Sequence, residues 1–329
     1  MTTTPARILA EVGAKLSFAQ TVPCELAHRR ALGEVFVADS AEVGDGSYVV
    51  GVQLPRAHSL WSDHTVAYHD PLAILEASRQ AAFVIVHRHL GIPVGPPFTM
   101  RRVAFRVLDL EGFRDDEVAP LEAVWHARMT DQLTEQTVIR QMTLAGTLLE
   151  DGAPIATLEG DLTFLPRPEY LQIRAIQQAR VNRLGVDRAP APLRTRLAPA
   201  LVGRQSSRNV VIGELTSPSS NGPTEFALVI DQSHPAFYDH RQDHVPGSLM
   251  VEAYRQAALV AAHRAGALPT PIAAVTGCSG SFEQFCEHGA LATCSAAVTA
   301  RGASITVAVA LHQFGTCVAS AEMELTPFP

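Results

Sequence analysis

The sequence predicts an α+β fold made of two similar domains, in each of which an antiparallel sheet wraps one long helix. Three observations support this prediction: an ungapped internal repeat, a largely apolar helix in each copy, and alternating strand-like segments after each helix. A chain of 329 residues is long enough for two ordinary domains with a hydrophobic core each. Hydrophobic residues make up 47% and charged residues 18%, which is a globular rather than a disordered composition.

The repeat aligns residues 58–88 with residues 234–264 without a gap, at a constant offset of 176. Twelve of the 31 aligned positions are identical, where average residue usage would give roughly two. The identical polar positions are His58 and His234, Asp63-His64 and Asp239-His240, Glu76 and Glu252, Arg79-Gln80 and Arg255-Gln256, and His87-Arg88 and His263-Arg264. Chance does not account for matches of this kind, so we infer a tandem duplication.

Strand-like segments flank the repeat in both halves. Upstream, a run that begins with Gly-Glu occurs at residues 33–37 and again at residues 213–215. Downstream, both halves contain long segments with the period-2 alternation of antiparallel strands. These segments are 121–149 and 155–165 in the first half, and 290–313 and 316–325 in the second. Each half therefore has the predicted order strand, strand, helix, strands.

A helix and a linker separate the two halves. Residues 169–184 have a helical pattern that would stop at Gly185, and the Pro/Ala/Arg stretch 189–199 is typical of a linker. We therefore expect an N-terminal domain over residues 1–168, a helix and linker over residues 169–204, and a C-terminal domain over residues 205–329.

Composition and charge argue against several classes of protein. A net charge of −7 disfavours a nucleic-acid binder, which needs clustered cations to neutralise phosphates. The five cysteines are scattered without a C-x-x-C pair, as is usual for free thiols in a reducing cytosol. The N-terminus lacks the apolar core of a signal peptide, and the apolar runs 81–86 and 257–262 are far too short to span a bilayer. We expect a cytoplasmic protein.

Each repeat contains one long helix with a narrow polar stripe. In the first helix, Asp70 is a typical N-cap, Pro71 suits the first helical position, and Gly91 is a typical stop. At about 100° per residue, the polar side chains fall within about a third of the circumference, and the remaining surface is apolar. The stripe consists of Glu76, Arg79, Gln80 and His87 in the first helix, and of Glu252, Arg255, Gln256 and His263 in the second.

Several interpretations of the polar stripe remain open from the residues alone. A solvent-facing stripe is common on surface helices, but apolar cover on two-thirds of the circumference indicates a helix wrapped by a sheet. A buried carboxylate beside a buried guanidinium must then be paired or functional. The i,i+3 pairs Glu76–Arg79 and Glu252–Arg255 could form purely structural ion pairs, or they could serve catalysis.

Two motifs resemble known families. Pro246-Gly-Ser-Leu-Met-Val-Glu252-Ala253 is similar to the P-G-x-L-x-x-E-A stretch of hotdog acyl-thioester dehydratases. The wider pattern, a His/Asp-rich loop followed by E-A-x-R-Q in both repeats, resembles the A-factor biosynthesis (AfsA) family of actinobacteria. The resemblance covers the chain from about His28 to Pro327. It implies two tandem hotdog domains that form a pseudo-dimer, the double-hotdog arrangement.

The resemblance to the AfsA family implies an acyltransferase. The family condenses a β-ketoacyl chain, delivered as an acyl-carrier-protein thioester, with dihydroxyacetone phosphate to make γ-butyrolactone-type, furan or butenolide signalling molecules. The resemblance therefore implies acyl carrier protein and dihydroxyacetone phosphate as partners and no cofactor, and it is compatible with a homodimer. A hotdog dehydratase or thioesterase, and a non-catalytic acyl- or lactone-binding protein, are the alternatives.

Four residues form the expected catalytic set. By resemblance, Glu76, Glu252 and Arg255 match the family's proposed functional positions, and Arg79 is the equivalent of Arg255. Acyl transfer to a hydroxyl needs a base, and a carboxylate desolvated on a buried helix suits this role, which we assign to Glu252. Arg255 or Arg79 would bind phosphate or carbonyl through its bidentate fork. Glu76 would act as a partner across the pseudo-two-fold axis.

Six further residues are expected to bind substrate. Backbone N–H groups at a helix N-terminus suit a developing oxyanion, and Gly247 would let a thioester approach that backbone closely. His240 and His244 precede the second helix and are the histidines expected to position the thioester. The remaining members of the set are Gln80, Gln256 and His69. A metal site built from the loop histidines is a weaker alternative, because no H-E-x-x-H or Cys/His spacing supports it.

Overall fold

The structure is a computed structural model that describes residues 11–12, 14–95, 97–133, 140–183, 195–215 and 223–329. Its contacts divide the chain into two compact units. The first unit is Met1–Ser62 with Ala67–Arg167, and the second is Asp63–Val66 with Pro168–Pro329. The short segment 63–66, which lies in sequence within the first half, therefore belongs by its contacts to the second.

The first unit is an antiparallel sheet with one long helix. Its sheet has the order β1-β2-β4-β5-β6-β3, and every neighbouring pair is antiparallel. The elements are β1 (Val37–Gly44), β2 (Ser47–Leu54), α2 (Ala73–Val84), a π-helical turn (Ile85–His89), β3 (Phe98–Val107), β4 (Leu121–Leu133), β5 (Arg140–Glu150) and β6 (Ala153–Phe164). The predicted order of strand, strand, helix and strands is confirmed for this half.

The second unit repeats this topology. Its sheet has the order β7-β8-β10-β11-β12-β9, again with antiparallel neighbours, so each strand has a counterpart in the first unit. The elements are α3 (Arg167–Arg183), β7 (Ile212–Glu214), β8 (Thr224–Leu228), α4 (Gly247–Arg264), β9 (Ala274–Phe282), β10 (Ala292–Arg301), β11 (Ile305–Gln313) and β12 (Thr316–Thr326). An identical strand order in both halves confirms the duplication in three dimensions.

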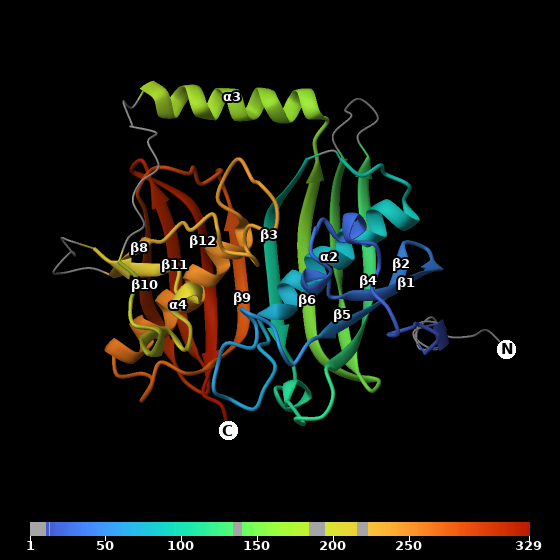
Figure 1. The fold of residues 1–329 in the computed structure, drawn as a ribbon, viewed down its shortest axis with the longest axis horizontal. Helices are drawn as coiled ribbons and strands as arrows, with labels where there is room; N and C mark the ends of the chain where they lie inside the picture. The colour runs from blue at the N-terminus through green and yellow to red at the C-terminus, as the bar shows by residue number, and fades with distance from the viewer. Residues whose placement is uncertain (1–10, 13, 96, 134–139, 184–194, 216–222) are drawn as a thin grey trace. The chain divides into compact units, whose positions relative to one another are not determined.

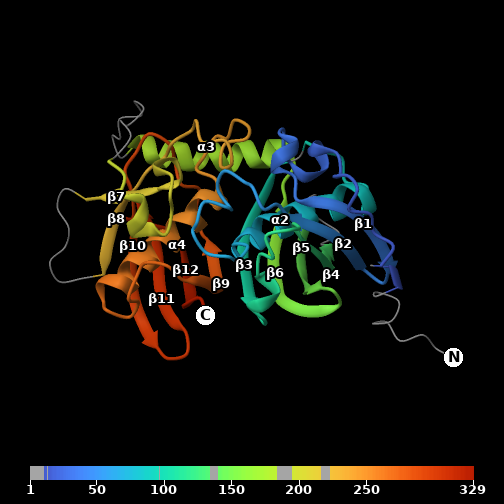
Figure 2. The same ribbon diagram turned by 60° about the horizontal axis from the view of Figure 1, so that its bottom comes forward.

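The long helix of each unit lies against one face of its own sheet, α2 in the first unit and α4 in the second (Figures 1 and 2). Fourteen of the 18 residues of α4 are buried, which fits a helix that is covered on most of its circumference. Runs of alanine such as 257–258 and 261–262 give α4 a thin profile that lets the sheet pack closely. The prediction of a wrapped helix is confirmed.

The ends of the first long helix follow the predicted signals with two differences. Asp70 Oδ1 accepts the amide of Leu72 at 3.0 Å, but the first turn is tight and α2 proper begins at Ala73. Gly91 ends the helical segment in a left-handed conformation, with φ of 67°. The last turn is π-helical, with the amide of Leu90 bonded to the carbonyl of Ile85, and the apolar periodicity did not predict this widening.

Of the two predicted strand-like runs that begin with Gly-Glu, the one at 33–37 is wrong and the one at 213–215 is confirmed within one residue. Gly33 and Glu34 lie in a 3-10 turn, and β1 begins only at Val37, whereas Gly213 and Glu214 lie inside β7. The two dipeptides are therefore not structural equivalents. The prediction also missed β3 and β9. Gly185 and most of the expected linker 189–199 lie outside the described residues.

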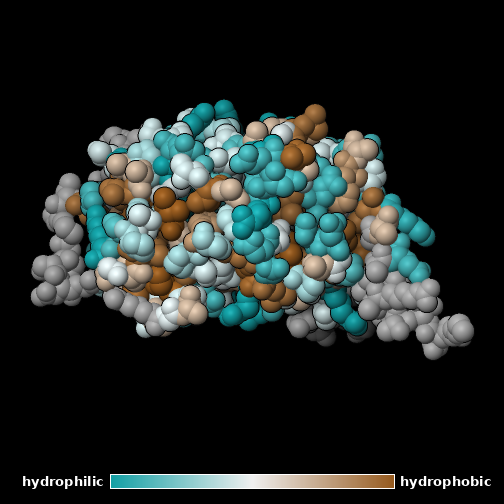
Figure 3. Space-filling view, turned by 90° about the horizontal axis from the view of Figure 1, so that it is seen from below, coloured by the Kyte–Doolittle hydropathy of each residue, from teal (hydrophilic) through white to brown (hydrophobic). Residues whose placement is uncertain are grey.

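The surface is mixed in character. On the face drawn in Figure 3, hydrophilic and hydrophobic residues are interspersed, as on ordinary globular domains, where apolar atoms contribute roughly half of the accessible area. Among the described helices, none combines the length and the apolarity that crossing a membrane requires.

Candidate active site

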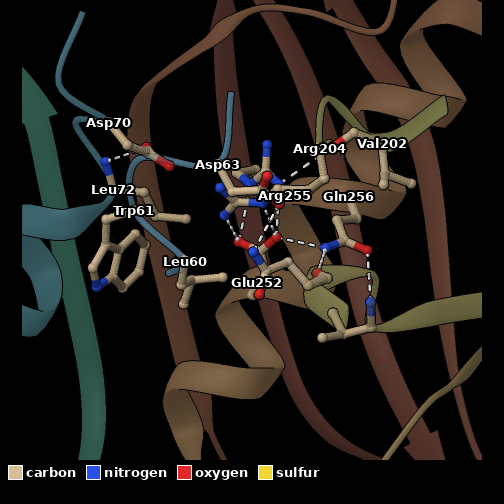
Figure 4. A network of polar contacts seen from close by, with 12 residues as sticks. Leu60, Trp61, Asp63, Asp70, Leu72, Val202, Arg204, Glu252, Arg255 and Gln256 are labelled. Carbon is tan, nitrogen blue, oxygen red and sulfur yellow. Dashed lines mark hydrogen bonds and ion pairs between the residues drawn. The ribbon is translucent and has the colours of Figure 1, made fainter. Parts of the chain in front are cut away.

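Two guanidinium groups enclose the carboxylate of Glu252 on α4 (Figure 4). Arg204 donates from Nε to Oε1 at 3.1 Å and from Nη2 to Oε2 at 2.9 Å. Arg255, one helical turn further on, donates from Nε to Oε2 at 2.9 Å and from Nη2 to Oε1 at 2.6 Å. Both pairs are bidentate, which is a strong geometry for a charge-assisted hydrogen bond. Because Glu252 is 0% exposed, these two pairs compensate the burial of its charge.

Gln256 connects the Glu252 carboxylate to the backbone that leads into β7 (Figure 4). Its Nε2 donates to Glu252 Oε1 at 2.5 Å and to the carbonyl of Asn209 at 2.7 Å. Its Oε1 accepts the amide of Val211 at 2.9 Å. The side chain is completely buried and its hydrogen bonds go to the protein itself. This geometry gives Gln256 the role of an internal clamp, and the substrate contact expected from the sequence stays a prediction.

A tight turn delivers Arg204 to Glu252. The 3-10 helix Pro199–Val202 ends at Gly203, whose left-handed conformation (φ 66°, ψ 27°) turns the chain so that Arg204 points back at α4. A Cβ at Gly203 would lie 3.1 Å from the carbonyl oxygen of Pro271, so a side chain there is crowded as well as strained. Arg255 Nη2 also donates to the carbonyl of Val202 at 3.3 Å. The turn therefore carries Arg204 and accepts a hydrogen bond from Arg255.

The first unit contains the same cluster around Glu76. Arg29 donates from Nε to Glu76 Oε1 at 3.1 Å, and Arg79 donates from Nε to Oε2 at 2.9 Å and from Nη2 to Oε1 at 2.7 Å. Gln80 repeats the clamp, with bonds to Glu76 Oε1, to the carbonyl of Glu34 and to the amide of Phe36. Each glutamate is thus enclosed by arginine and glutamine side chains of its own half. The role of Glu76 across the pseudo-two-fold axis stays a prediction.

The turn that delivers Arg29 also matches its counterpart. The 3-10 helix Cys24–Ala27 ends at His28, which adopts the left-handed conformation with φ of 52° in the place taken by Gly203. The His28 ring stacks on Phe83 at 4.1 Å between centroids, and its Nε2 lies 2.8 Å from His87 Nε2. The contacts of the His28 ring offset the energetic cost of a left-handed backbone conformation, which residues other than glycine rarely adopt.

The two carboxylates are ionised and weakly basic. Burial by itself would raise the pKa of Glu252, but the nearby Arg204 and Arg255 outweigh it and lower the pKa to about 2. The pKa of Glu76 is likewise lowered to about 2, because Arg29 and Arg79 outweigh the effect of burial. A carboxylate with this pKa is a poor proton acceptor near neutral pH. The proton-acceptor role expected for Glu252 therefore finds no support in its electrostatics.

A second layer of polar contacts supports the Arg204 turn. Asn209 Oδ1 lies 2.9 Å from His234 Nε2, and Asn209 Nδ2 donates to Asp63 Oδ2 at 2.7 Å. Asp63 also accepts the amides of Gln205 and Ser206, each at about 3.1–3.2 Å. In the first unit, His58 Nε2 approaches Glu34 Oε2 to 3.3 Å without hydrogen-bond geometry. The hydrogen bond that His234 Nε2 makes in the second unit therefore has no equivalent at His58 Nε2 among the described residues.

The N-terminus of α4 presents backbone donors. Pro246 is its N-cap residue and makes no side-chain capping bond, and the first amides of a helix have no acceptor within it. A Cβ at Gly247 would meet only the ring of Phe282, at 3.6 Å. The N-terminus of α2 differs, because the Asp70 carboxylate accepts the amide of Leu72 there. An anionic ligand atom is therefore better accommodated at α4 than at α2.

The arginines on the two long helices differ in exposure. The side chain of Arg79 is 26% exposed, whereas that of Arg255 is 7% exposed. The guanidinium carbon of Arg79 lies 4.9 Å from the centroid of the Phe83 ring, at the edge of the His28 stack. Of the pair expected to bind phosphate or carbonyl, Arg79 is the one with a substantial surface open to a ligand.

The three histidines of the expected substrate-binding set lie in different surroundings. His69 is buried in the first unit, with its amide bonded to the carbonyl of Phe113 at 2.7 Å. His240 has a side chain that is 34% exposed and lies 3.8 Å from Asp239. His244 lies 2.6 Å from Asp243 Oδ1, three residues before α4 begins. Within the described part of the chain, no three His, Cys, Asp or Glu side chains gather as metal ligands would.

The sequence analysis missed Arg29 and Arg204, which complete the two clusters. Their turns align with an offset of 175, one less than in the repeat: Leu26-x-x-Arg29 matches Leu201-x-x-Arg204. The single-residue shift falls between the turns and the ungapped block that starts at residue 58. Extending the repeat upstream with one gap would have found both arginines.

Comparison with known proteins identifies the family. The chain matches the A-factor biosynthesis hotdog domain (AfsA) twice, over residues 13–166 and 186–329. It belongs to the AfsA family. Because each match covers one structural unit almost completely, both halves are hotdog domains, and the predicted tandem arrangement is confirmed.

Curated relatives of this AfsA-family protein are named 2-oxo-3-(phosphooxy)propyl 3-oxoalkanoate synthase. One from Streptomyces virginiae is 33% identical over 243 residues, which cover 72% of this chain and 76% of the relative. One from Streptomyces coelicolor is 30% identical over 250 residues, covering 76% and 75%. One from Streptomyces griseus is 29% identical over 310 residues, covering 91% and 93%. The similarity therefore extends over both hotdog domains.

Proposed function

We propose that this protein condenses a β-ketoacyl thioester with dihydroxyacetone phosphate, as an acyltransferase in the biosynthesis of a γ-butyrolactone-type, furan or butenolide signalling molecule. The observation that carries the proposal is membership of the AfsA family, with relatives of 29–33% identity named for the ester of these two substrates. The hydroxyl oxygen attacks the thioester carbonyl, a C–O bond forms, the C–S bond breaks, and the thiol leaves with the hydroxyl proton.

The N-terminus of α4 is the proposed site of the thioester carbonyl. Attack on the carbonyl puts a negative charge on its oxygen, and the amides of Gly247 and Ser248 point out of the helix end at the positive pole of its dipole. Preorganised backbone donors of this kind stabilise a tetrahedral intermediate. Since the matching end of α2 already binds the Asp70 carboxylate, we assign the chemistry to the second half.

The glutamate clusters support the site rather than transfer protons. Glu252 holds Arg204 and Arg255 in fixed positions and remains ionised, because its pKa is lowered to about 2. Gln256 fixes the same carboxylate to the backbone. Arg255 in the second half and Arg79 in the first are the two proposed ligands for a phosphate or carbonyl group, and Arg79 has the more exposed side chain of the two.

The acyl chain is proposed to arrive on acyl carrier protein, and the enzyme is proposed to work in the cytoplasm without a cofactor. A homodimer is compatible with this function. These assignments follow from the nature of the substrates, since β-ketoacyl chains and dihydroxyacetone phosphate are cytoplasmic intermediates that react here without a change in redox state.

The test is a reconstitution with pure protein, a β-ketoacyl thioester and dihydroxyacetone phosphate, followed by mass spectrometry of the products. We expect the phosphorylated ester or the butenolide derived from it. Free β-keto acid as the sole product would instead identify a thioesterase, and no turnover a binding protein. In a parallel assay with a 3-hydroxyacyl thioester alone, loss of water would identify a dehydratase. Each of these outcomes contradicts the proposal.

The choice between Arg255 and Arg79 has its own test. The variant that removes the phosphate ligand, Arg255→Met or Arg79→Met, should raise the KM for dihydroxyacetone phosphate more than about tenfold, because a guanidinium–phosphate pair contributes well over 1 kcal/mol. The KM for the thioester should change little. Arg106→Met, at an exposed arginine on β3, is the control. Equal effects on both KM values in both variants would contradict a phosphate role for either arginine.

A further inference from the structure

The weakly basic Glu252 leaves the proposed acyl transfer without a proton acceptor. We propose that His244, oriented by Asp243, accepts the hydroxyl proton of the acceptor substrate, and that helix α3 positions this pair. The inference rests on the proposed function, because it concerns the chemical step of that reaction.

Asp243 and His244 form an Asp–His pair of catalytic geometry. His244 Nδ1 lies 2.6 Å from Asp243 Oδ1, and the ring packs edge-on against Phe285 with centroids 4.7 Å apart. A carboxylate at Nδ1 fixes the tautomer with the proton on that nitrogen and leaves the Nε2 lone pair to act as a base. Nε2 has no hydrogen-bond partner among the described residues, and the side chain is 23% exposed. The free nitrogen is therefore accessible to a ligand.

Asp243 is itself held in place by α3. The hydroxyl of Tyr170 donates to its two oxygens at 2.8 and 3.0 Å, and Arg174 Nε donates to Oδ2 at 3.0 Å. Burial would raise the pKa of Asp243, but the contacts with His244, Tyr170 and Arg174 outweigh it and hold the pKa well below its usual range. The carboxylate remains charged and can stabilise an imidazolium beside it.

Arg174 links α3 to both loops that flank His244. It is 3% exposed and donates to Glu287 from Nη1 at 2.7 Å and from Nη2 at 3.0 Å, and also to the carbonyl of Asp243 at 2.9 Å. Gln177 adds a bond to the carbonyl of Phe285 at 2.6 Å. A buried arginine with this many fixed acceptors immobilises the loops on the helix. Helix α3 thus determines where the Asp–His pair lies.

His244 lies close enough to the proposed thioester site to act there. Only Val245 and Pro246 separate it from Gly247, the first residue of α4, so the chain between them spans at most about 10 Å. Val245 is buried and its amide bonds to the carbonyl of Cys286 at 2.8 Å, which fixes this short connection. The imidazole and the helix N-terminus therefore belong to one rigid segment.

The proposed step balances without any further reactant. His244 Nε2 takes the proton of the substrate hydroxyl as its oxygen bonds to the thioester carbon, and the oxyanion forms at the amides of Gly247 and Ser248. When the intermediate collapses, the C–S bond breaks and the imidazolium returns the proton to the leaving sulfur. This sequence is the general base and general acid cycle of acyl transfer, with a substrate hydroxyl as nucleophile.

The test compares three variants in the reconstituted reaction. His244→Asn keeps a donor for Asp243 but has no basic nitrogen, and we expect kcat to fall at least about 100-fold with both KM values within threefold. His244→Ala should be partly rescued by added imidazole, which a merely structural role would not allow. Tyr170→Phe removes one donor to Asp243 and should lower kcat severalfold without changing the urea midpoint. His312→Asn on β11 is the matched control and should behave as wild type.

Each outcome supports the inference or overturns it. If the wild-type protein makes the ester and His244→Asn retains kcat within threefold, His244 is not the base and the proposed function stands. If His244→Ala is inactive and imidazole restores nothing while the fold is intact, the histidine is structural. If the wild-type protein makes no ester, the proposed function fails first, and the inference falls with it.

Discussion

Arg204 bonds both carboxylate oxygens of Glu252, with Nε 3.1 Å from Oε1 and Nη2 2.9 Å from Oε2, although 48 positions separate them in the chain. Arg29 likewise reaches Glu76 from a turn 47 positions away and donates from Nε to Oε1 at 3.1 Å. The glutamate of each long helix is therefore held by one arginine from its own helix and one from a distant turn. This arrangement stabilises the fold and at the same time suppresses the basicity of the carboxylate.

The first prediction concerns the loss of one guanidinium. Arg204→Met should lower the free energy of unfolding by about 3 kcal/mol, because a buried carboxylate then loses half of its compensation. Urea unfolding followed by circular dichroism measures the change. Arg264→Met is the matched control, since Arg264 pairs with Glu214 on the surface and its removal should cost less than about 1 kcal/mol. Equal losses in both variants would contradict the structural account of the cluster.

The second prediction concerns acid. Glu76 and Glu252 have folded-state pKa values lowered to about 2, below the unfolded value of about 4.5. A depressed carboxyl pKa stabilises the fold above the unfolded pKa, and this contribution is lost as the pH falls from about 4.5 to about 2. At about 1.4 kcal/mol per pKa unit, each carboxyl group contributes roughly 3 kcal/mol to the free energy of unfolding at pH values above its unfolded pKa.

Urea titrations at several pH values test this acid dependence. Glu252→Gln should be less stable than wild type at pH 6, and its stability should fall less steeply between pH 4.5 and pH 2.5. Glu214→Gln, at the exposed partner of Arg264, should follow the wild-type slope. A Glu252→Gln protein with an unchanged slope would show that the carboxylate is not ion-paired in solution.

The third prediction concerns the glutamine clamp. Gln256→Met keeps the volume of the side chain but leaves the amide of Val211 and the carbonyl of Asn209 without their partner. Each unsatisfied buried group costs about 1–3 kcal/mol, so we expect a loss of at least about 2 kcal/mol in unfolding free energy. Gln53→Met should cost less than about 0.5 kcal/mol, because Gln53 bonds Glu122 at the surface. A small effect of Gln256→Met would exclude the clamp.

Local signals explain what the sequence predicted. The apolar pattern of residues 247–264 predicts a helix that is buried on most of its circumference. The spacing of Glu252 and Arg255 places them one turn apart on this helix. The alternation in 290–313 and 316–325 likewise fixes strands β10 to β12. These features depend on residues that are neighbours in the chain, so a single sequence is enough to identify them.

Non-local contacts explain what the sequence left open. The prediction that desolvation would make Glu252 basic did not include Arg204, which reaches the carboxylate from a distant turn and together with Arg255 outweighs burial, so the pKa is lowered. Gln256 looked like a polar group facing a ligand because its backbone partners, Asn209 and Val211, are 47 and 45 positions away. Which groups surround a buried side chain is a property of the fold and not of the helix that carries it.

The last prediction concerns His234, which is 1% exposed. Burial, aided by Arg208, lowers its pKa to about 4, while unfolding restores a value near 6.5. Between these two pKa values the unfolded chain binds a proton that the folded chain does not. The free energy of unfolding therefore falls by roughly 3 kcal/mol as the pH decreases from 6.5 to about 4. His234→Gln keeps a donor for Asn209, and its free energy of unfolding, measured in urea, should depend less on pH over this window than that of the wild type. His312→Gln should keep the wild-type pH dependence. An unchanged slope in His234→Gln would show that His234 is accessible to protons in the folded state.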